Sequence, residues 1–302
     1  MAEASIVFII PYFGRWPFWL PLFLKSCRFN PRINWILYSD CGQPDDLPAN
    51  VRYVQMSFAE YCQLVSRRLG FAFNPQRAYK LCDLKPALGH VHAADIEGFD
   101  FWGFSDIDVI YGQLRDYFTA EKLARYDFFS THERRVSGHL CLMRNSERMR
   151  TAFRLIPDFQ QRLCDEKSHA LDEGAFTRIF LWRKNFPKPL FRFVGLFNPW
   201  RRKAVFEELY STPNAGRPWV DGSENFPAHW YWRNGVLTTD NTGARTFPYF
   251  HFYGWKKWSW GDAGGADTGR IAEVAARDQW LIDAQGFHAL PQRQGVEQGV
   301  AT

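Results

Sequence analysis

The chain has 302 residues, 46% of them hydrophobic, which is enough apolar material for one large α/β domain or two small ones and argues against disorder of the whole. Its formal charge is +5, with Lys and Arg scattered among Asp and Glu. This pattern argues against duplex nucleic acid as a partner, which demands a denser basic face, and suits an anionic small substrate or a weakly attractive membrane surface.

The sequence of the first 56 residues predicts alternating strands and helices. A β-branched and aromatic run at 5–10 ends at Pro11 and is typical of a buried parallel strand. The alternation continues to residue 105, with predicted strands at 34–39, 51–56 and 101–105 and predicted helices at 22–27, 58–69 and 82–93. It favours an α/β fold with a mainly parallel central sheet flanked by helices, whose ligand lies beyond the carboxyl ends of the strands.

The second half is less regular. We predict strands at 127–130, 138–143 and 247–250, helices at 146–164 and 172–182, and an irregular segment at 185–229. Asn234-Gly235 predicts the turn of a hairpin over 229–238. We expect one domain over 1–260 and a C-terminal extension over 261–302, with a helix at 271–281 and a loose tail.

Cysteine usage and the N-terminus indicate a cytoplasmic protein. The cysteines form no Cys-x-x-Cys pair and are interpreted as reduced thiols: Cys27, Cys41, Cys62, Cys82, Cys141 and Cys164. The first residues carry no basic cluster, and the apolar run that follows stops at Pro11, which argues against a secretory signal. No run approaches the roughly 20 apolar residues of a membrane-spanning helix.

Two carboxylates, Asp106 and Asp108, follow the predicted strand 101–105 and flank Ile107. If strand geometry persists through this triplet, both carboxylates point the same way and Ile107 points into the protein. Such a pair attracts Mg²⁺ or Mn²⁺, which is often completed by substrate phosphates. A solvated loop is the competing interpretation, but two acids at the end of a buried strand repel each other unless a cation intervenes.

A second motif, His251-Phe252-Tyr253-Gly254-Trp255-Lys256-Lys257, follows the predicted aromatic strand 247–250. His251 can supply a third metal ligand, Gly254 allows close backbone approach to a donor, and Lys257 can neutralise a diphosphate leaving group. An aromatic core hairpin with a stacked histidine explains the same residues without a ligand. The Asp-x-Asp pair favours the metal site.

Together the two motifs resemble the retaining GT-A glycosyltransferases of family 8, the group of glycogenin and the bacterial lipooligosaccharide galactosyltransferases. The resemblance implies a GT-A fold, Mn²⁺ or Mg²⁺ bound by Asp106, Asp108 and His251, and contact between Lys257 and the diphosphate. It also implies a nucleotide-sugar donor, expected to be UDP-linked, a saccharide or glycolipid acceptor, and retention of the anomeric configuration. We therefore expect a hexosyltransferase, with surface polysaccharide synthesis as its setting.

Further donor-site candidates lie upstream. Many GT-A enzymes carry a basic residue on the helix before the Asp-x-Asp strand, and Lys80 and Lys85 resemble it, although a solvated lysine explains them equally well. Pro11, Tyr12 and Asp40 end the first two predicted strands, where Tyr12 can stack on a base and Asp40 can accept a ribose or base hydrogen bond.

The pair Asp172-Glu173 occupies a position similar to an Asp-Gln pair of family 8 that meets the donor sugar and the reacting face. This resemblance makes Asp172 and Glu173 the candidate catalytic residues, while the helix dipole alone also favours carboxylates at a helix start. His139, after Ser137-Gly138, is interpreted as a structural histidine rather than a catalytic one.

The segment 186–206 mixes aromatic and basic residues, which fits either a peripheral contact with the inner face of a membrane or a buried irregular loop. Two alternatives to the transferase remain open. A carbohydrate-binding protein would use the aromatic residues as a sugar platform and the aspartates for Ca²⁺. A sugar nucleotidyltransferase would need a Gly-rich basic loop after the first strand, of which residues 11–15 are a poor version.

Overall fold

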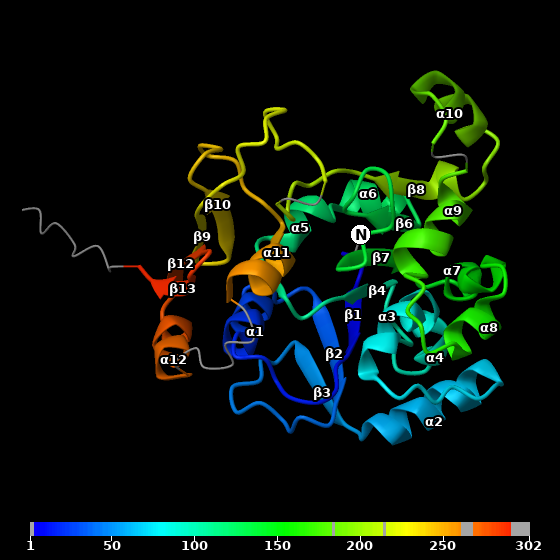
Figure 1. Ribbon diagram of the computed structural model, residues 1–302, viewed down its shortest axis with the longest axis horizontal. Coiled ribbons are helices and arrows are strands. Elements are labelled where there is room, and N and C mark those ends of the chain that lie inside the picture. The colour runs from blue at the N-terminus through cyan, green and yellow to red at the C-terminus, as the bar shows by residue number, and fades with distance from the viewer. Residues whose placement is uncertain (1–2, 183–184, 214–215, 261–267, 291–302) are drawn as a thin grey trace, which may run out of the picture.

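A seven-stranded mixed sheet forms the centre of the computed structural model, which describes residues 3–182, 185–213, 216–260 and 268–290 (Figure 1). Its strands lie in the order β3-β2-β1-β4-β7-β6-β8. The β3/β2, β2/β1, β1/β4 and β6/β8 pairs are parallel, whereas β4/β7 and β7/β6 are antiparallel. The bounds are β1 Ile6–Pro11, β2 Asn34–Ser39, β3 Val51–Gln55, β4 Phe101–Ser105, β6 Phe128–Ser130, β7 Leu140–Arg144 and β8 Ala204–Phe206. The predicted mainly parallel α/β fold is confirmed.

Strand β1 shows why this sheet is buried on both faces. Val7 and Ile9 pack into one apolar cluster, whereas Phe8 and Ile10 pack into a second cluster on the opposite face. The helices that cover the two faces are α1 Leu20–Arg28, α2 Phe58–Leu69, α3 Leu81–Leu84, α4 Leu88–Val91, α5 Leu114–Tyr117, α6 Ala120–Arg125, α7 Glu147–Arg150, α8 Phe159–Cys164 and α9 Thr177–Phe180.

Helix α2 follows its sequence signals closely. Ser57 and Glu60 form a reciprocal capping box at its start, and Gly70 ends it in the left-handed conformation with φ 79°. The predicted bounds, 58–69, are therefore confirmed at both ends.

Three predicted helices are broken into shorter pieces. The helix expected at 82–93 is interrupted by a 3₁₀ turn, Lys85–Ala87, that contains Pro86. The helix expected at 146–164 consists of α7, a 3₁₀ turn at Ala152–Leu155 and α8, because Pro157 imposes extended backbone on Ile156 before it. The third, expected at 172–182, begins with a π-helical turn, Asp172–Phe176, and ends with α9.

In its described part, the segment expected to be irregular contains a helix, a short 3₁₀ turn at Arg201–Lys203 and a strand. Helix α10 (Lys188–Gly195) stands apart from the sheet at the upper right of Figure 1. Strand β8 (Ala204–Phe206) pairs with β6 at the edge of the central sheet. The expectation of irregular structure over 185–229 is thus wrong at these two elements.

A second sheet of four strands, in the order β10-β9-β12-β13, lies at the left of Figure 1. Its bounds are β9 Trp230–Arg233, β10 Val236–Thr239, β12 Gln279–Asp283 and β13 Gly286–Ala289. Asn234 and Gly235, with φ of 49° and 80°, form the turn of the predicted hairpin. The helix expected at 271–281 is instead α12 (Thr268–Ala276), followed by β12, which pairs with β9.

The C-terminal extension therefore packs against a strand that precedes residue 260. The boundary between 260 and 261 stays a prediction, and the expected loose tail at 291–302 lies outside the described residues. Among the residues that the structure describes, none of the helices has the length and apolar character that crossing a membrane would demand.

A short two-stranded sheet joins the two halves of the chain. Strand β5 (Val109–Tyr111) pairs antiparallel with β11 (Tyr249–His251), so that Val109 lies opposite His251. This pairing places the end of the predicted aromatic strand directly beside the Asp-x-Asp triplet.

Candidate active site

A cavity of ≈ 780 Å³ opens at the carboxyl ends of β1 and β4. Among the sequence-predicted residues, those that line it are Pro11, Tyr12, Lys85, Asp106, Asp108, Asp172, Glu173, His251 and Gly254. The sheet thus presents its ligand site at the edge expected for parallel strands. Its lining mixes aromatic rings with a small number of convergent charged groups, as ligand sites commonly do.

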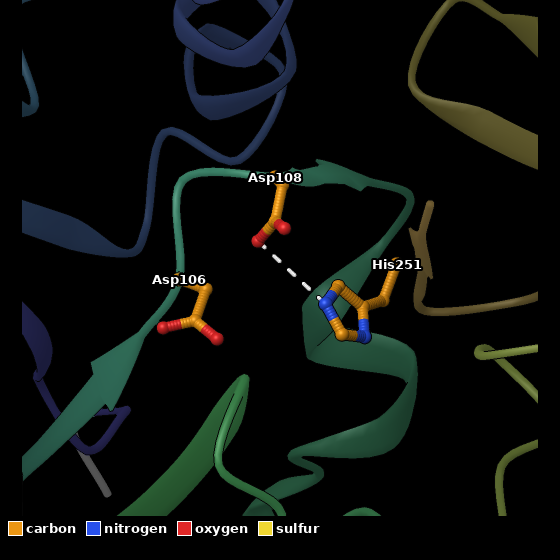
Figure 2. Close-up of side chains that lie close together, drawn as sticks. All are labelled: Asp106, Asp108 and His251. Atoms are coloured by element: carbon orange, nitrogen blue, oxygen red, sulfur yellow. Dashed lines mark ion pairs between the residues drawn. The ribbon is translucent and has the colours of Figure 1, made fainter. Parts of the chain in front are cut away.

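Asp106, Asp108 and His251 converge on one side of this cavity (Figure 2). One ligand atom from each lies within 4.8 Å of the other two. Strand geometry does not persist through the triplet, because β4 ends at Ser105 and β5 begins at Val109. The bend still buries Ile107 in the apolar core and turns both carboxylates toward the same space.

Asp108 is more buried than Asp106, and two basic groups compensate its charge. His251 Nε2 lies 3.6 Å from Asp108 Oδ1, and the Lys256 ammonium group donates a hydrogen bond to Oδ2. Burial alone would raise the pKa of Asp108, but His251 and Lys256 outweigh burial and hold it well below its usual range. Asp108 is therefore an anion at neutral pH.

Lys85 occupies the corresponding position beside Asp106. Its Nζ lies 2.5 Å from Asp106 Oδ1 and 3.8 Å from Asp172 Oδ2, and it donates to the Gly138 carbonyl at 2.8 Å. Burial would lower the pKa of Lys85, but the attraction of Asp106 raises it above its ordinary value. Of the two lysines proposed from the upstream helix, Lys85 is the one that reaches the cavity.

The two candidate catalytic carboxylates lie on the π-helical turn 172–176, opposite Gly138. Burial raises the pKa of Asp172 to about 6, against the opposing charge of Lys85. Glu173 is half-buried, and one of its oxygens lies 3.3 Å from Arg135 Nη1, which also lines the cavity. The pair therefore differs in environment, with one carboxyl desolvated and the other ion-paired at the cavity wall.

His139 also lines the cavity, and its ring packs against that of His251. The two rings stack with centroids 4.1 Å apart, and His139 Nε2 contacts Tyr249 Oη at 2.7 Å. Thr212 Oγ1 lies 3.2 Å from His251 Nδ1, which leaves Nε2 of that ring directed toward Asp108. Burial and the neighbouring His251 hold the pKa of His139 well below its ordinary value, as expected for a structural histidine.

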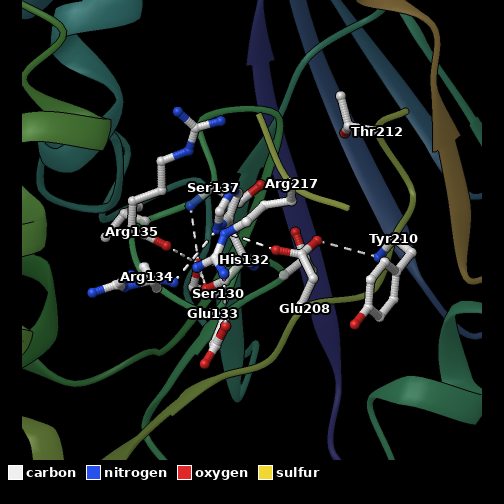
Figure 3. Close-up of polar contacts among 12 residues, drawn as sticks. Ser130, His132, Glu133, Arg134, Arg135, Ser137, Glu208, Tyr210, Thr212 and Arg217 are labelled. Atoms are coloured by element: carbon white, nitrogen blue, oxygen red, sulfur yellow. Dashed lines mark hydrogen bonds and ion pairs between the residues drawn. The ribbon is translucent and has the colours of Figure 1, made fainter. Parts of the chain in front are cut away.

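Next to these residues, the loop after β6 contacts the segment after β8 (Figure 3). Ser130 Oγ donates to the Arg135 carbonyl at 2.7 Å and fixes the loop that carries Arg135. Glu208 lies 3.3 Å from His132 Nδ1 and accepts a hydrogen bond from the Tyr210 amide. These contacts position the segment that leads to Thr212.

Three of the residues predicted from the sequence do not line the cavity. Lys80 is buried, donates to the carbonyls of Arg162 and Lys167, and pairs with Asp83 at 3.0 Å. Asp40 accepts a hydrogen bond from the Gly14 amide at 2.8 Å. Lys257 is absent from the cavity lining, where its neighbour Lys256 is found. The structure thus gives Lys80 and Asp40 local structural contacts.

The donor set fits a hard divalent cation, which Asp106, Asp108 and His251 would hold through two carboxylates and one imidazole. The lysine ammonium groups on the two carboxylates show that the site attracts positive charge. Lys256 is the more exposed of these lysines, with 34% of its side chain accessible, so it can withdraw without opening the core.

A protein-family model described as "Family of unknown function (DUF6625)" matches residues 8–259. The chain belongs to this family. No curated protein matches it. Among solved structures, it is similar to galactosyltransferase LgtC in complex with donor and acceptor sugar analogs, with 12% identity, a TM-score of 0.41 and coverage of 90% of this chain and 95% of that chain. It is also similar to mouse xyloside xylosyltransferase 1, with 10% identity, a TM-score of 0.38 and coverage of 70% and 87%.

Sequence reasoning missed Lys256, Arg135 and Thr212. The structure explains why Lys256 reaches the cavity, because Phe252 caps a helical turn and its amide donates to the Asp108 carbonyl. The residue four positions later returns to the same side of a helix, which selects Lys256 over Lys257. Arg135 and Thr212 lie in loops whose paths no local pattern determines.

Proposed function

We propose that this family member transfers a hexose from a nucleotide-diphosphate sugar, with UDP as the nucleotide, to a hydroxyl of a saccharide or lipid-linked acceptor. A bound Mn²⁺ or Mg²⁺ would neutralise charge that builds on the diphosphate. The observation that carries the proposal is the convergence of Asp106, Asp108 and His251, from two distant segments, within 4.8 Å at the mouth of one cavity.

The reaction breaks the bond between the anomeric carbon and a diphosphate oxygen, and the electron pair leaves with the diphosphate. The acceptor hydroxyl forms the new bond to carbon and gives up its proton. Because the leaving group is anionic, positive charge near it lowers the barrier without a proton donor. Lys256 and Lys85 supply positive charge beside the carboxylates, and we keep Lys257 as a further candidate for diphosphate contact.

An aromatic ring in the cavity lining suits a nucleoside. Tyr12 follows β1 and stacks on Trp16, with ring centroids 5.5 Å apart and an interplanar angle of 9°. This flat pair offers a face for a base, and Pro11 fixes the backbone before it. Asp40 holds the intervening loop through Gly14.

Asp172 and Glu173 are proposed to meet the donor sugar and the reacting face. Arg135 holds Glu173 at the cavity wall, and Lys85 connects Asp172 to Asp106. The pKa of about 6 keeps Asp172 able to exist in either protonation state near neutral pH. A desolvated acid of this kind can donate a hydrogen bond to a sugar hydroxyl or accept one from it.

The proposal is tested with a thermal-shift panel of UDP, GDP and UDP-sugars, each with and without Mn²⁺. A ligand present at 100 times its Kd stabilises the native state by about 2.7 kcal/mol. We expect a shift with UDP that requires Mn²⁺ in the native protein, and loss of the Mn²⁺-dependent part in Asp106→Asn and Asp108→Asn.

Asp45→Asn is the matched control, because Asp45 is an exposed aspartate that does not line the cavity. It should retain the full shift. A Mn²⁺-dependent UDP shift that survived both cavity substitutions would remove the metal assignment. Binding of free sugars without any nucleotide response would identify a carbohydrate-binding protein instead. Release of UDP from a UDP-hexose, measured with candidate acceptors, then tests transfer itself.

A further inference from the structure

The segment from Gly174 to Phe206 carries an uncompensated positive charge. Over these 33 residues the sequence contains no Asp or Glu, although the whole chain contains 32 of them. Eight Lys and Arg residues lie in the same stretch: Arg178, Arg183, Lys184, Lys188, Arg192, Arg201, Arg202 and Lys203. Arg192, Arg202 and Lys203 are exposed. Such a run attracts an anionic surface.

Large apolar side chains are exposed on the same segment. We call them the α10 patch: Trp182, Phe186, Leu190, Phe193, Leu196 and Phe197. Phe193, Leu196 and Phe197 are 58%, 68% and 67% exposed. Leu190 and Phe193, three residues apart, lie on one side of α10, and Leu196 and Phe197 directly follow its end. Phe193 and Phe197 contact each other, with ring centroids 5.3 Å apart, and both remain largely exposed.

Buried residues next to the α10 patch anchor this segment to the apolar core. Phe191 and Trp200 pack against the apolar core, opposite the exposed side chains. Asn198 is fully buried, donates to the carbonyls of Ile179 and Phe180, and accepts from the Trp200 amide. Helix α10 therefore stands apart from the central sheet on a buried attachment (Figure 1).

The combination of positive charge and exposed aromatic side chains favours a lipid surface over a second protein chain as the partner of the α10 patch. A bilayer interface accepts phenylalanine and leucine side chains into its acyl boundary while arginine and lysine meet anionic headgroups. A second copy of the chain would bring this basic segment against the same segment on a two-fold axis, with no acid within it to offset the repulsion. Charge complementarity thus points to an acidic membrane.

We propose that the α10 patch and the basic residues around it dock this protein on the surface of an anionic phospholipid bilayer. The docking does not depend on nucleotide or metal, since none of its residues lines the cavity. It would bring a lipid-linked acceptor and the cavity to the same surface. The patch lies on the membrane and does not cross it.

The test is co-sedimentation of the full chain with phosphatidylcholine vesicles that do or do not contain phosphatidylglycerol, without nucleotide, at low and high salt. We expect binding to the anionic vesicles to exceed binding to the neutral ones by at least about tenfold and to weaken with salt. Phe193→Ser combined with Phe197→Ser should abolish binding, and Arg202→Glu combined with Lys203→Glu should weaken it by at least about tenfold.

Matched controls distinguish docking from general surface effects. Leu155→Ser removes another exposed apolar side chain, and Arg67→Glu with Arg68→Glu reverses another exposed basic pair; both should bind as the native protein does. Equal melting temperatures confirm that the variants fold. Failure to bind anionic vesicles would overturn the proposal, as would equal losses in patch and control variants. So would a dimer in solution that the phenylalanine substitutions dissociate, because the patch would then serve a second copy.

Discussion

Lys256 donates a hydrogen bond to the carboxylate of Asp108, the same group that His251 approaches to 3.6 Å. The ammonium group therefore occupies a carboxylate that a divalent cation would need as a ligand. A cation that binds Asp108 must compete with Lys256, whereas Lys257 does not line the cavity.

This competition gives a first prediction. Lys256→Met should strengthen Mn²⁺ binding in the absence of nucleotide by about three- to fivefold, the worth of a partly exposed ion pair. Lys257→Met is the matched control and should leave Mn²⁺ affinity unchanged. Isothermal titration calorimetry with Mn²⁺ alone measures both. Weaker binding in the Lys256 variant would show that this lysine assists the cation site and does not compete for it.

A second prediction concerns Asp172. Burial raises its pKa from 3.8 to about 6. Between these values the native state holds the proton more tightly than the unfolded chain, so the contribution to stability is fully present below 3.8 and is lost as pH rises through about 6. Asp172→Asn cannot ionise and should exceed the native protein in stability at about pH 8 by up to about 3 kcal/mol, at roughly 1.4 kcal/mol for each pH unit between the two pKa values.

Near pH 4 the two proteins should unfold at similar urea concentrations, because a protonated carboxyl and an amide are then both neutral. Urea unfolding at the two pH values measures the difference, with Asp45→Asn as the exposed control. A stability difference that did not change with pH would contradict the assignment.

A third prediction follows from the close approach at Gly138. A Cβ atom at this position would lie 2.8 Å from Asp172 Oδ2 and 3.1 Å from Glu173 Oε1, so both carboxylates would have to move. Gly138→Ala should lower kcat by about 10- to 100-fold, because small displacements of positioned groups are costly. Gly174→Ala, on the same turn as the carboxylates, meets its nearest atom at 3.9 Å and should retain activity. Equal losses in both variants would show that the turn itself, and not the carboxylate position, had changed.

The fourth prediction concerns the base of α10. Asn198→Ala removes two hydrogen bonds to backbone carbonyls and leaves the Trp200 amide without its acceptor in a fully buried place. We expect a loss of about 2–4 kcal/mol in the free energy of unfolding. Asn185→Ala, an exposed asparagine in the same part of the chain, should cost little. A melting temperature unchanged by Asn198→Ala would show that the helix is anchored by its apolar contacts alone.

Sequence patterns predicted the central strands well, because β1, β2 and β4 are continuous apolar runs with clear ends. They failed where a proline lay inside an apolar pattern, as at Pro86 and Pro157. Strand β12 was taken for the end of a helix, since a short apolar run has no period that separates the two.

The sequence also indicated only some of the residues of the candidate site. Asp106, Asp108 and His251 were found because each follows an apolar strand and carries a side chain that binds cations. Lys80 could not be separated from Lys85 by sequence, because both are buried and only the fold pairs Lys80 with Asp83 and Lys85 with Asp106. The partners of Glu173 and His251 come from loops, and only the folded chain brings Arg135 and Thr212 beside them.

The three residue pairs that join β5 to β11 link an early and a late part of the chain. An occupied cation site would hold this joint together through Asp108, which directly precedes β5, and His251, which ends β11. The region after residue 249 should then resist proteolytic trimming when Mn²⁺ and nucleotide are present and yield to it when they are withdrawn. Ligand binding would thus stabilise the pairing of β5 with β11 and, with it, the attachment of the C-terminal part of the chain.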